Sequence, residues 1–156
     1  MSTNKFNLFL ENARLLSDKL GIVPLLYGSL GLEYLTGDAL DADDIDILVP
    51  RIFITNRWHE FKSFLEVQGY VLADEHEHTF VRDGVAYSYA DIEDLEAFAG
   101  INTEDIEMHE ADGVRFLLLS LEQYLAVYRK SSKDGYRVNV RQKKDADKIR
   151  FIESKL

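Results

Sequence analysis

The chain of 156 residues contains no cysteine, only two prolines and one tryptophan. The absence of cysteine excludes disulfides, zinc–thiolate sites and a cysteine nucleophile, and it suits a reducing compartment. No apolar run approaches the roughly 18 to 20 residues that a membrane-spanning helix requires. The first residues also lack the charged-then-apolar pattern of a signal peptide. We therefore expect a cytoplasmic protein with no membrane partner.

Positive charge is also scarce, because 18 Lys and Arg residues face 28 Asp and Glu residues, for a net charge of −10. This charge argues against a nucleic-acid partner, since phosphate is repelled at long range. The basic residues that do occur gather in the last thirty positions, among them Lys143, Lys144 and Arg150. A basic tail fits a small anionic substrate such as a nucleoside triphosphate, although solvated helix faces explain such charges equally well.

Length and a hydrophobic content of 46% predict one domain over residues 1–156, with a core that needs no disulfide. Apolar residues at spacings of three and four, or a capping box in the case of Ser120-Leu-Glu-Gln123, predict helices. These helices are expected at 6–20, 30–35, 57–68, 121–130 and 143–154.

Apolar runs, continuous or alternating with polar residues, predict strands between the helices. These strands are expected at 22–27, 43–50, 70–72, 78–82, 85–91, 106–109 and 114–118. Asp83-Gly84 and Asp112-Gly113 mark two hairpin turns. The predicted fold class is therefore α/β (α+β), with a mixed, mainly antiparallel sheet flanked by helices.

One stretch couples a Gly-Ser turn to two aspartates. An apolar run ends at Gly28-Ser29, and Asp44 and Asp46 then alternate with Ile and Leu on the next predicted strand. Residues two apart on a strand face the same side, so these two carboxylates project together. Without a cation the pair would repel and one pKa would rise, and such oxygen ligands suit Mg2+ or Mn2+.

The Gly28-Ser29 turn lies where a strand runs into a helix, so its backbone N–H groups can hold phosphate. The spacing Gly28-Ser-Leu-Gly31 matches neither a Walker sequence nor a dinucleotide fingerprint. An EF-hand starting at Asp41 fails, because no glycine occupies its sixth position and Ile52 stands where the bidentate Glu belongs. The remaining prediction is a site for a metal-bound nucleotide.

Gly28-Ser29, followed by Asp44 and Asp46 and by a further acidic residue on a later strand, resembles the nucleotidyltransferase superfamily, whose fold is shared by DNA polymerase beta, antibiotic nucleotidyltransferases and small prokaryotic members. The resemblance implies that Gly28 and Ser29 lie against the triphosphate and that Asp44 and Asp46 bind metal. By position, Asp91 matches the third metal-binding carboxylate, which also helps to activate the acceptor hydroxyl.

The closing segment Arg141-Gln-Lys-Lys144-Asp145 is similar to the Lys-Asp-rich last helix of the small antibiotic-modifying members. Many members also carry a basic residue near the Gly-Ser turn or just before the first aspartate. Here those places read Leu30-Gly-Leu-Glu33 and Asp41-Ala-Asp43. Phosphate charge would then be met by the metal and by Arg51, Lys143 or Lys144.

The resemblance implies an ATP-binding, magnesium-dependent transferase that moves an NMP group from an NTP to a hydroxyl of an unknown small-molecule or protein acceptor and releases pyrophosphate. A catalytically inactive nucleotide- or protein-binding module on the same fold is the alternative, and a toxin is a third. Because the chain is short, the acceptor is small, or a homodimer mate or partner chain completes the cleft. Four tyrosines, which either stack a base or fill the core, are Tyr27, Tyr34, Tyr87 and Tyr89.

Overall fold

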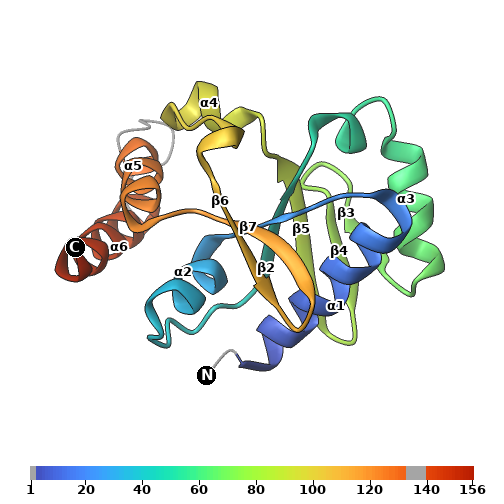
Figure 1. Ribbon diagram of the computed structural model, residues 1–156, viewed down its shortest axis with the longest axis horizontal. Helices are drawn as coiled ribbons and strands as arrows, with labels where there is room; N and C mark the ends of the chain where they lie inside the picture. The colour runs from blue at the N-terminus through green and yellow to red at the C-terminus, as the bar shows by residue number, and fades with distance from the viewer. Residues whose placement is uncertain (1–2, 133–139) are drawn as a thin grey trace.

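A seven-stranded sheet forms the centre of the protein, and its strands follow the order β3-β4-β5-β2-β1-β7-β6 (Figure 1). The computed structural model describes residues 3–132 and 140–156. The strands are β1 (Leu25–Tyr27), β2 (Ile45–Val49), β3 (Val71–Asp74), β4 (Thr79–Arg82), β5 (Val85–Asp91), β6 (Glu107–Ala111) and β7 (Val114–Leu118). Every strand that the sequence predicts is therefore present, with shifts of a few residues at the ends.

The helices are α1 (Thr3–Leu20), α2 (Gly28–Thr36), α3 (Trp58–Val67), α4 (Asp94–Ala99), α5 (Leu121–Ser132) and α6 (Val140–Lys155). Two short 3-10 helices, η1 (Arg51–Ile54) and η2 (Thr103–Asp105), complete the list. The five predicted helices are confirmed. The sequence did not predict α4, because a helix of six residues in which only Leu95 is buried shows no apolar period.

The sheet is mixed, which corrects the prediction of a mainly antiparallel sheet. The outer pairings are antiparallel, but β2 runs parallel to β5, and β1 runs parallel to β7. Parallel neighbours need a long crossover, which between β2 and β5 runs through η1, α3, β3 and β4, and no local turn signal in a sequence reports such a pairing. The parallel pairing of β2 with β5 decides which residues lie beside the candidate site.

Two kinds of short sequence pattern, the Asp-Gly hairpin turns and the capping box, form contacts between residues that are close in the sequence. Both hairpin turns have a left-handed residue pair, with φ of 52° at Asp83 and 78° at Gly84, and 51° at Asp112 and 75° at Gly113. Two successive positive φ values fit the type I′ turn that Asp-Gly favours. The capping box also forms, since Gln123 N donates to Ser120 Oγ at 3.1 Å and Ser120 N donates to Gln123 Oε1 at 2.9 Å.

The two faces of the sheet differ. Ile45 pairs with Tyr87 and Ile47 with Tyr89, and all four side chains are buried on the face that α1 and α3 cover. Tyr89 accepts a hydrogen bond from Asn12 of α1 and contacts the ring of Phe61 of α3. The opposite face carries Asp46 on β2 and Ser88 and Ala90 on β5, and Ala90 is exposed.

The last two helices lie to one side of this sheet. In Figure 1, α5 and α6 lie together at the left end of the molecule, beyond α2 and away from α1 and α3. They pack against each other, and Arg129 of α5 pairs with Glu153 of α6 at 2.9 Å. Within the ranges described, no helix has the length and the apolar character needed to cross a membrane.

Candidate functional site

The Gly28-Ser29 turn packs directly against Asp46. Tyr27 on β1 pairs with Asp46 on β2, so the residue that follows Tyr27 meets the Asp46 side chain. Gly28 has φ of +66°, and a Cβ placed there would overlap Oδ2 of Asp46 and lie 3.3 Å from its Cγ. Only glycine satisfies both the left-handed backbone and this close approach. The turn and the second aspartate, 18 positions apart in the sequence, therefore form one structural unit.

Asp44 and Asp46 line the same cleft as Gly28 and Ser29, and the volume of this cleft is about 590 Å³. Asp46 is the second residue of β2, whereas Asp44 lies just before the strand and is exposed. We call this space the acidic cleft. Its other lining residues include Asp41 and Asp43 from the loop before β2, and Phe98 from α4. The structure thus brings four of the predicted site residues together.

Helix α5 forms a further wall of the acidic cleft and is tied to the turn by Tyr124. Tyr124 is 1% exposed, and its hydroxyl donates a 3.0 Å hydrogen bond to the carbonyl oxygen of Gly28. Burial raises the pKa of Tyr124 well above the usual value, so the hydroxyl keeps its proton. Gly31, one helical turn further on, allows this approach, because a Cβ there would overlap the same hydroxyl.

Helix α6 contributes Asp145 and Lys148 to the acidic cleft. Asp145 is buried and accepts a 2.7 Å hydrogen bond from the Ser131 hydroxyl of α5. Asp145 belongs to the closing segment that resembles the last helix of the small family members, but the sequence indicates no role for it, and no sequence pattern points to Tyr124. The predicted phosphate ligands Lys143 and Lys144 belong to α6, but their side chains lie outside the described residues.

The structure does not bring Asp91 to the acidic cleft, which corrects the expectation taken from the resemblance. Asp46 pairs with Ser88 on β5, whereas Asp91 pairs with Val49. Residues that pair side by side face the same side of a sheet, so Asp91 faces away from Asp46. The Asp91 carboxylate instead binds the Arg51 guanidinium and accepts a 2.8 Å hydrogen bond from Glu93 N.

The Arg51–Asp91 pair explains the acidic residue at the end of β5 in structural terms. Arg51 also reaches Asp94 at 3.1 Å, so its side chain connects η1 to the start of α4. Its hydrogen bond to Asp91 is the main reason that the pKa of Arg51 is raised above its ordinary value. The pair holds together the segments that follow β2 and β5.

The described lining of the acidic cleft contains five aspartates (41, 43, 44, 46 and 145) and one lysine, Lys148. Such a lining favours cations. Among the residues that the structure describes, no group of three histidine or carboxylate side chains is placed to hold a metal. Two carboxylates still fit Mg2+, which commonly takes one or two protein carboxylates and completes its shell with water and substrate phosphates. The donor set therefore fits a metal that arrives with a nucleotide.

The tyrosines divide into different environments. Tyr27 lines the acidic cleft, Tyr34 stacks on Phe6 away from it, and Tyr87 and Tyr89 are buried in the core. Tyr128 of α5, which the sequence did not single out, also lines the cleft. Only Tyr27 of the four candidates is therefore placed to touch a ligand in this cleft.

Comparison with solved structures identifies the fold as nucleotidyltransferase-like. The chain superposes on the solution structure of the antibiotic-resistance factor ANT(2'')-Ia with a TM-score of 0.55 and 14% identity, over 99% of this chain and 92% of that one. On the crystal structure of ANT(2")-Ia in complex with adenylyl-2"-tobramycin it superposes with a TM-score of 0.59 and 14% identity, over 98% of this chain and 90% of that one. On the crystal structure of an antigenic nucleotidyltransferase-like protein from Paracoccidioides brasiliensis the TM-score is 0.61 and the identity 16%, over 94% of this chain and 73% of that one.

Comparison of sequences defines the family more closely. The chain is 40% identical over 147 residues to the uncharacterized protein YnaI of Bacillus subtilis (strain 168), and the match covers 94% of each. The chain therefore belongs to the YnaI family, and its own fold is nucleotidyltransferase-like. No protein-family model matches the chain.

Proposed function

We propose that the protein is a metal-dependent nucleotidyltransferase that moves an NMP group from an NTP, such as ATP, to a hydroxyl of an acceptor and releases pyrophosphate. One observation carries the proposal, namely that the Gly28-Ser29 turn packs against Asp46 in a cleft that Asp44 also lines. A phosphate-binding helix N-terminus beside two carboxylates is what a metal–triphosphate complex requires.

The chain's own groups have separate roles in this proposal. Ser29 and the first backbone N–H groups of α2 bind the β- and γ-phosphates at the positive end of a nine-residue helix. Asp44 and Asp46 hold Mg2+ or Mn2+, which when bound neutralises charge on the phosphate oxygens. The acceptor oxygen bonds to the α-phosphorus while the bond from that phosphorus to the bridging oxygen breaks, and pyrophosphate leaves.

Lys148, which lines the cleft from α6, is the described cation that can meet phosphate charge, and we propose the same role for Lys143 and Lys144. We assign Asp91 no metal, because its carboxylate binds Arg51. A carboxylate inside the cleft must then accept the proton of the acceptor hydroxyl, and Asp46 is our candidate for this role.

A small acceptor fits this proposal best. The described cleft holds about 590 Å³, within the range of sites for a nucleotide-sized ligand. The neighbour ANT(2")-Ia forms a complex with adenylyl-2"-tobramycin, an adenylylated small molecule. A cytoplasmic location, where NTP and magnesium are present, belongs to the proposal, as does a homodimer mate or partner chain that completes the acceptor side.

The test is calorimetric titration of the protein with Mg2+ and ATP, followed by an assay of pyrophosphate release with a panel of hydroxyl-bearing acceptors. Asp44→Asn and Asp46→Asn should each strongly weaken Mg2+-dependent ATP binding, because the ion loses one of its two carboxylate ligands. Asp83→Asn, at an exposed hairpin turn, is the matched control, since asparagine tolerates its left-handed backbone. Unchanged ATP affinity in both cleft variants would remove the proposal.

The second candidate is a nucleotide-binding module without catalysis. One observation favours it. The residues of β5 on the same face of the sheet as Asp46 are Ser88 and Ala90, so β5 supplies no third carboxylate beside Asp46. Both candidates bind Mg2+ and ATP, so binding does not separate them. Pyrophosphate release that depends on an added acceptor supports the enzyme, and tight binding without turnover on any acceptor supports the module.

A further inference from the structure

Glu33 lies on the same helix as the phosphate-binding turn but contacts the loop that carries the aspartates. It is buried, with 9% of its surface exposed. Its Oε2 atom accepts hydrogen bonds from Leu40 N at 3.1 Å and from Ala42 N at 3.0 Å. We call residues 37–44, between α2 and β2, the acidic loop. Glu33 therefore bonds the middle of the acidic loop to the body of α2.

The two amides held by Glu33 lie next to the residues that reach the acidic cleft. Leu40 and Ala42 flank Asp41, and Ala42 precedes Asp43 and Asp44, and all five line the cleft. Asp41 has φ of 52°, a backbone conformation that a non-glycine residue adopts at a cost and keeps only when its neighbours hold it. Glu33 constrains Asp41 in this way, because it accepts hydrogen bonds from the backbone N–H groups of the residues before and after Asp41.

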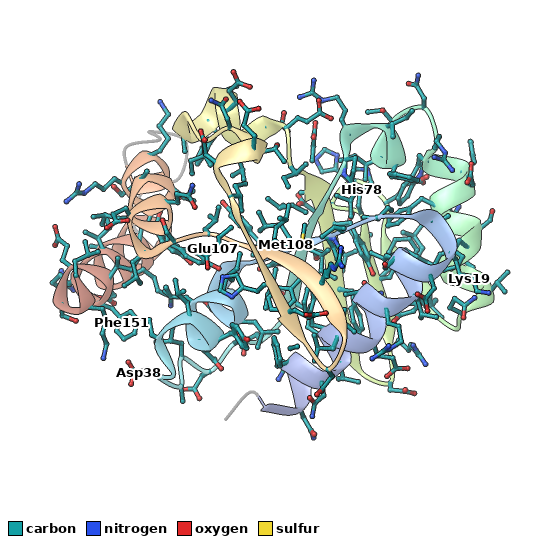
Figure 2. All side chains as sticks on the ribbon, in the orientation of Figure 1. Lys19, Asp38, His78, Glu107, Met108 and Phe151 are labelled. Carbon is teal, nitrogen blue, oxygen red and sulfur yellow. The ribbon has the colours of Figure 1, made fainter. Side chains whose placement is uncertain are left out.

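An ion pair near the start of the acidic loop is a weaker attachment. Asp38 pairs with Lys155 of α6 at 2.6 Å, and Lys155 also lies over the Phe151 ring, at the end of the molecule where Figure 2 labels Asp38 and Phe151. Both side chains of this ion pair are about two-fifths exposed, and exposed pairs contribute little. Glu33 is thus the buried anchor of the loop.

We propose that Glu33 is a positioning residue that holds Asp44 in register with the Gly28-Ser29 turn, so that metal and triphosphate bind as one complex. The inference rests on the proposed function and extends it to a residue that does not line the cleft. Helix α2 carries the turn at its first two positions and Glu33 at its sixth, so one rigid helix sets the distance between the phosphates and the loop. The group of Glu33 that makes both contacts with the loop is the acceptor oxygen Oε2.

The experiment compares Glu33→Ala, which removes the acceptor, with Glu33→Gln, which keeps it. Mn2+ binding is measured by electron paramagnetic resonance with and without ATP, and ATP binding is measured without metal. Glu33→Ala should weaken Mn2+–ATP binding about tenfold or more, since it removes two bonds to a buried acceptor. Glu33→Gln should bind within about threefold of the wild type, and metal-free ATP should bind both alike. Asp38→Asn is the control for the exposed ion pair, and it should change neither Mn2+–ATP binding nor metal-free ATP binding.

Amide hydrogen exchange separates this inference from the proposed function. Leu40 and Ala42 amides should lose protection in Glu33→Ala and keep it in Glu33→Gln. Unchanged exchange in Glu33→Ala, or a Gln variant that binds Mn2+–ATP as poorly as Ala, would overturn the positioning role. A wild-type protein that binds no Mn2+–ATP would instead overturn the proposed function. If Glu33→Ala does not fold, Glu33→Met, which fills the same space without an acceptor, takes its place.

Discussion

Gly28 lies against the carboxylate of Asp46, so close that a Cβ on the glycine would overlap Oδ2 and lie 3.4 Å from the Cβ of the aspartate. This contact joins the end of β1 to the second residue of β2 across one antiparallel pairing. It places the turn for which we propose phosphate binding beside the side chain for which we propose metal binding, and substitution of residue 28 tests both roles.

Gly28→Ala should lower the free energy of unfolding by about 1–2 kcal/mol for its left-handed backbone alone, and should also displace Asp46 and abolish Mg2+-dependent ATP binding. Chemical denaturation and calorimetry measure the two effects. Gly84→Ala is the matched control, because Gly84 has φ of +78° with nothing near its Cβ. The control should lose stability but keep ATP affinity. Equal ATP affinity in both variants would contradict the role given to the Gly28–Asp46 contact.

Tyr124→Phe should remove the hydrogen bond to the Gly28 carbonyl while the ring stays in place. The expected loss is about 1 kcal/mol of stability, a typical value for one hydrogen bond, together with weaker ATP binding, because the turn loses a constraint. Tyr34→Phe is the control, since Tyr34 is on the surface and outside the cleft. An ATP affinity that does not change in Tyr124→Phe would show that α5 does not position the turn.

Stability should fall in alkaline solution partly because of the buried tyrosines. Burial raises the pKa of Tyr89 and Tyr124 above the ordinary value of 10.0 that applies to the unfolded chain. The folded state then keeps these protons when the unfolded state releases them, so their contribution is present in full below pH 10 and is lost as pH rises above it. Urea midpoints between pH 8 and 11 measure the slope. Tyr124→Phe should flatten it, because one of the two buried phenols is removed.

Asp91→Asn should lower stability and leave Mg2+-dependent ATP binding intact. The carboxylate binds Arg51 and lies on the face of the sheet opposite Asp46, so its charge serves the contact between η1 and α4. Asp46→Asn should do the reverse, with lost binding and little change in the denaturation midpoint. If Asp91→Asn lost ATP binding while its midpoint stayed at the wild-type value, Asp91 would belong to the metal site after all.

Local patterns predicted most of the elements. The Asp83-Gly84 and Asp112-Gly113 turns, the Ser120–Gln123 capping box and the amphipathic periods of α1 and α3 all depend on residues a few positions apart. Such signals are complete within the sequence, because the interacting groups are neighbours along the chain. The Gly-Ser turn and the two aspartates were likewise readable, since each is a short motif beside a predicted strand.

Only the tertiary structure decided which of the acidic residues share a site. Asp91 ends the strand that the sequence predicted, but the parallel register of β2 with β5 places Ser88, not Asp91, beside Asp46. Tyr124 reaches Gly28 from 96 positions away, and Asp145 reaches the cleft from the last helix. Register and helix packing are set by long-range burial across the whole chain. A one-residue difference in register turns a side chain to the other face of the sheet, and no local pattern records that difference.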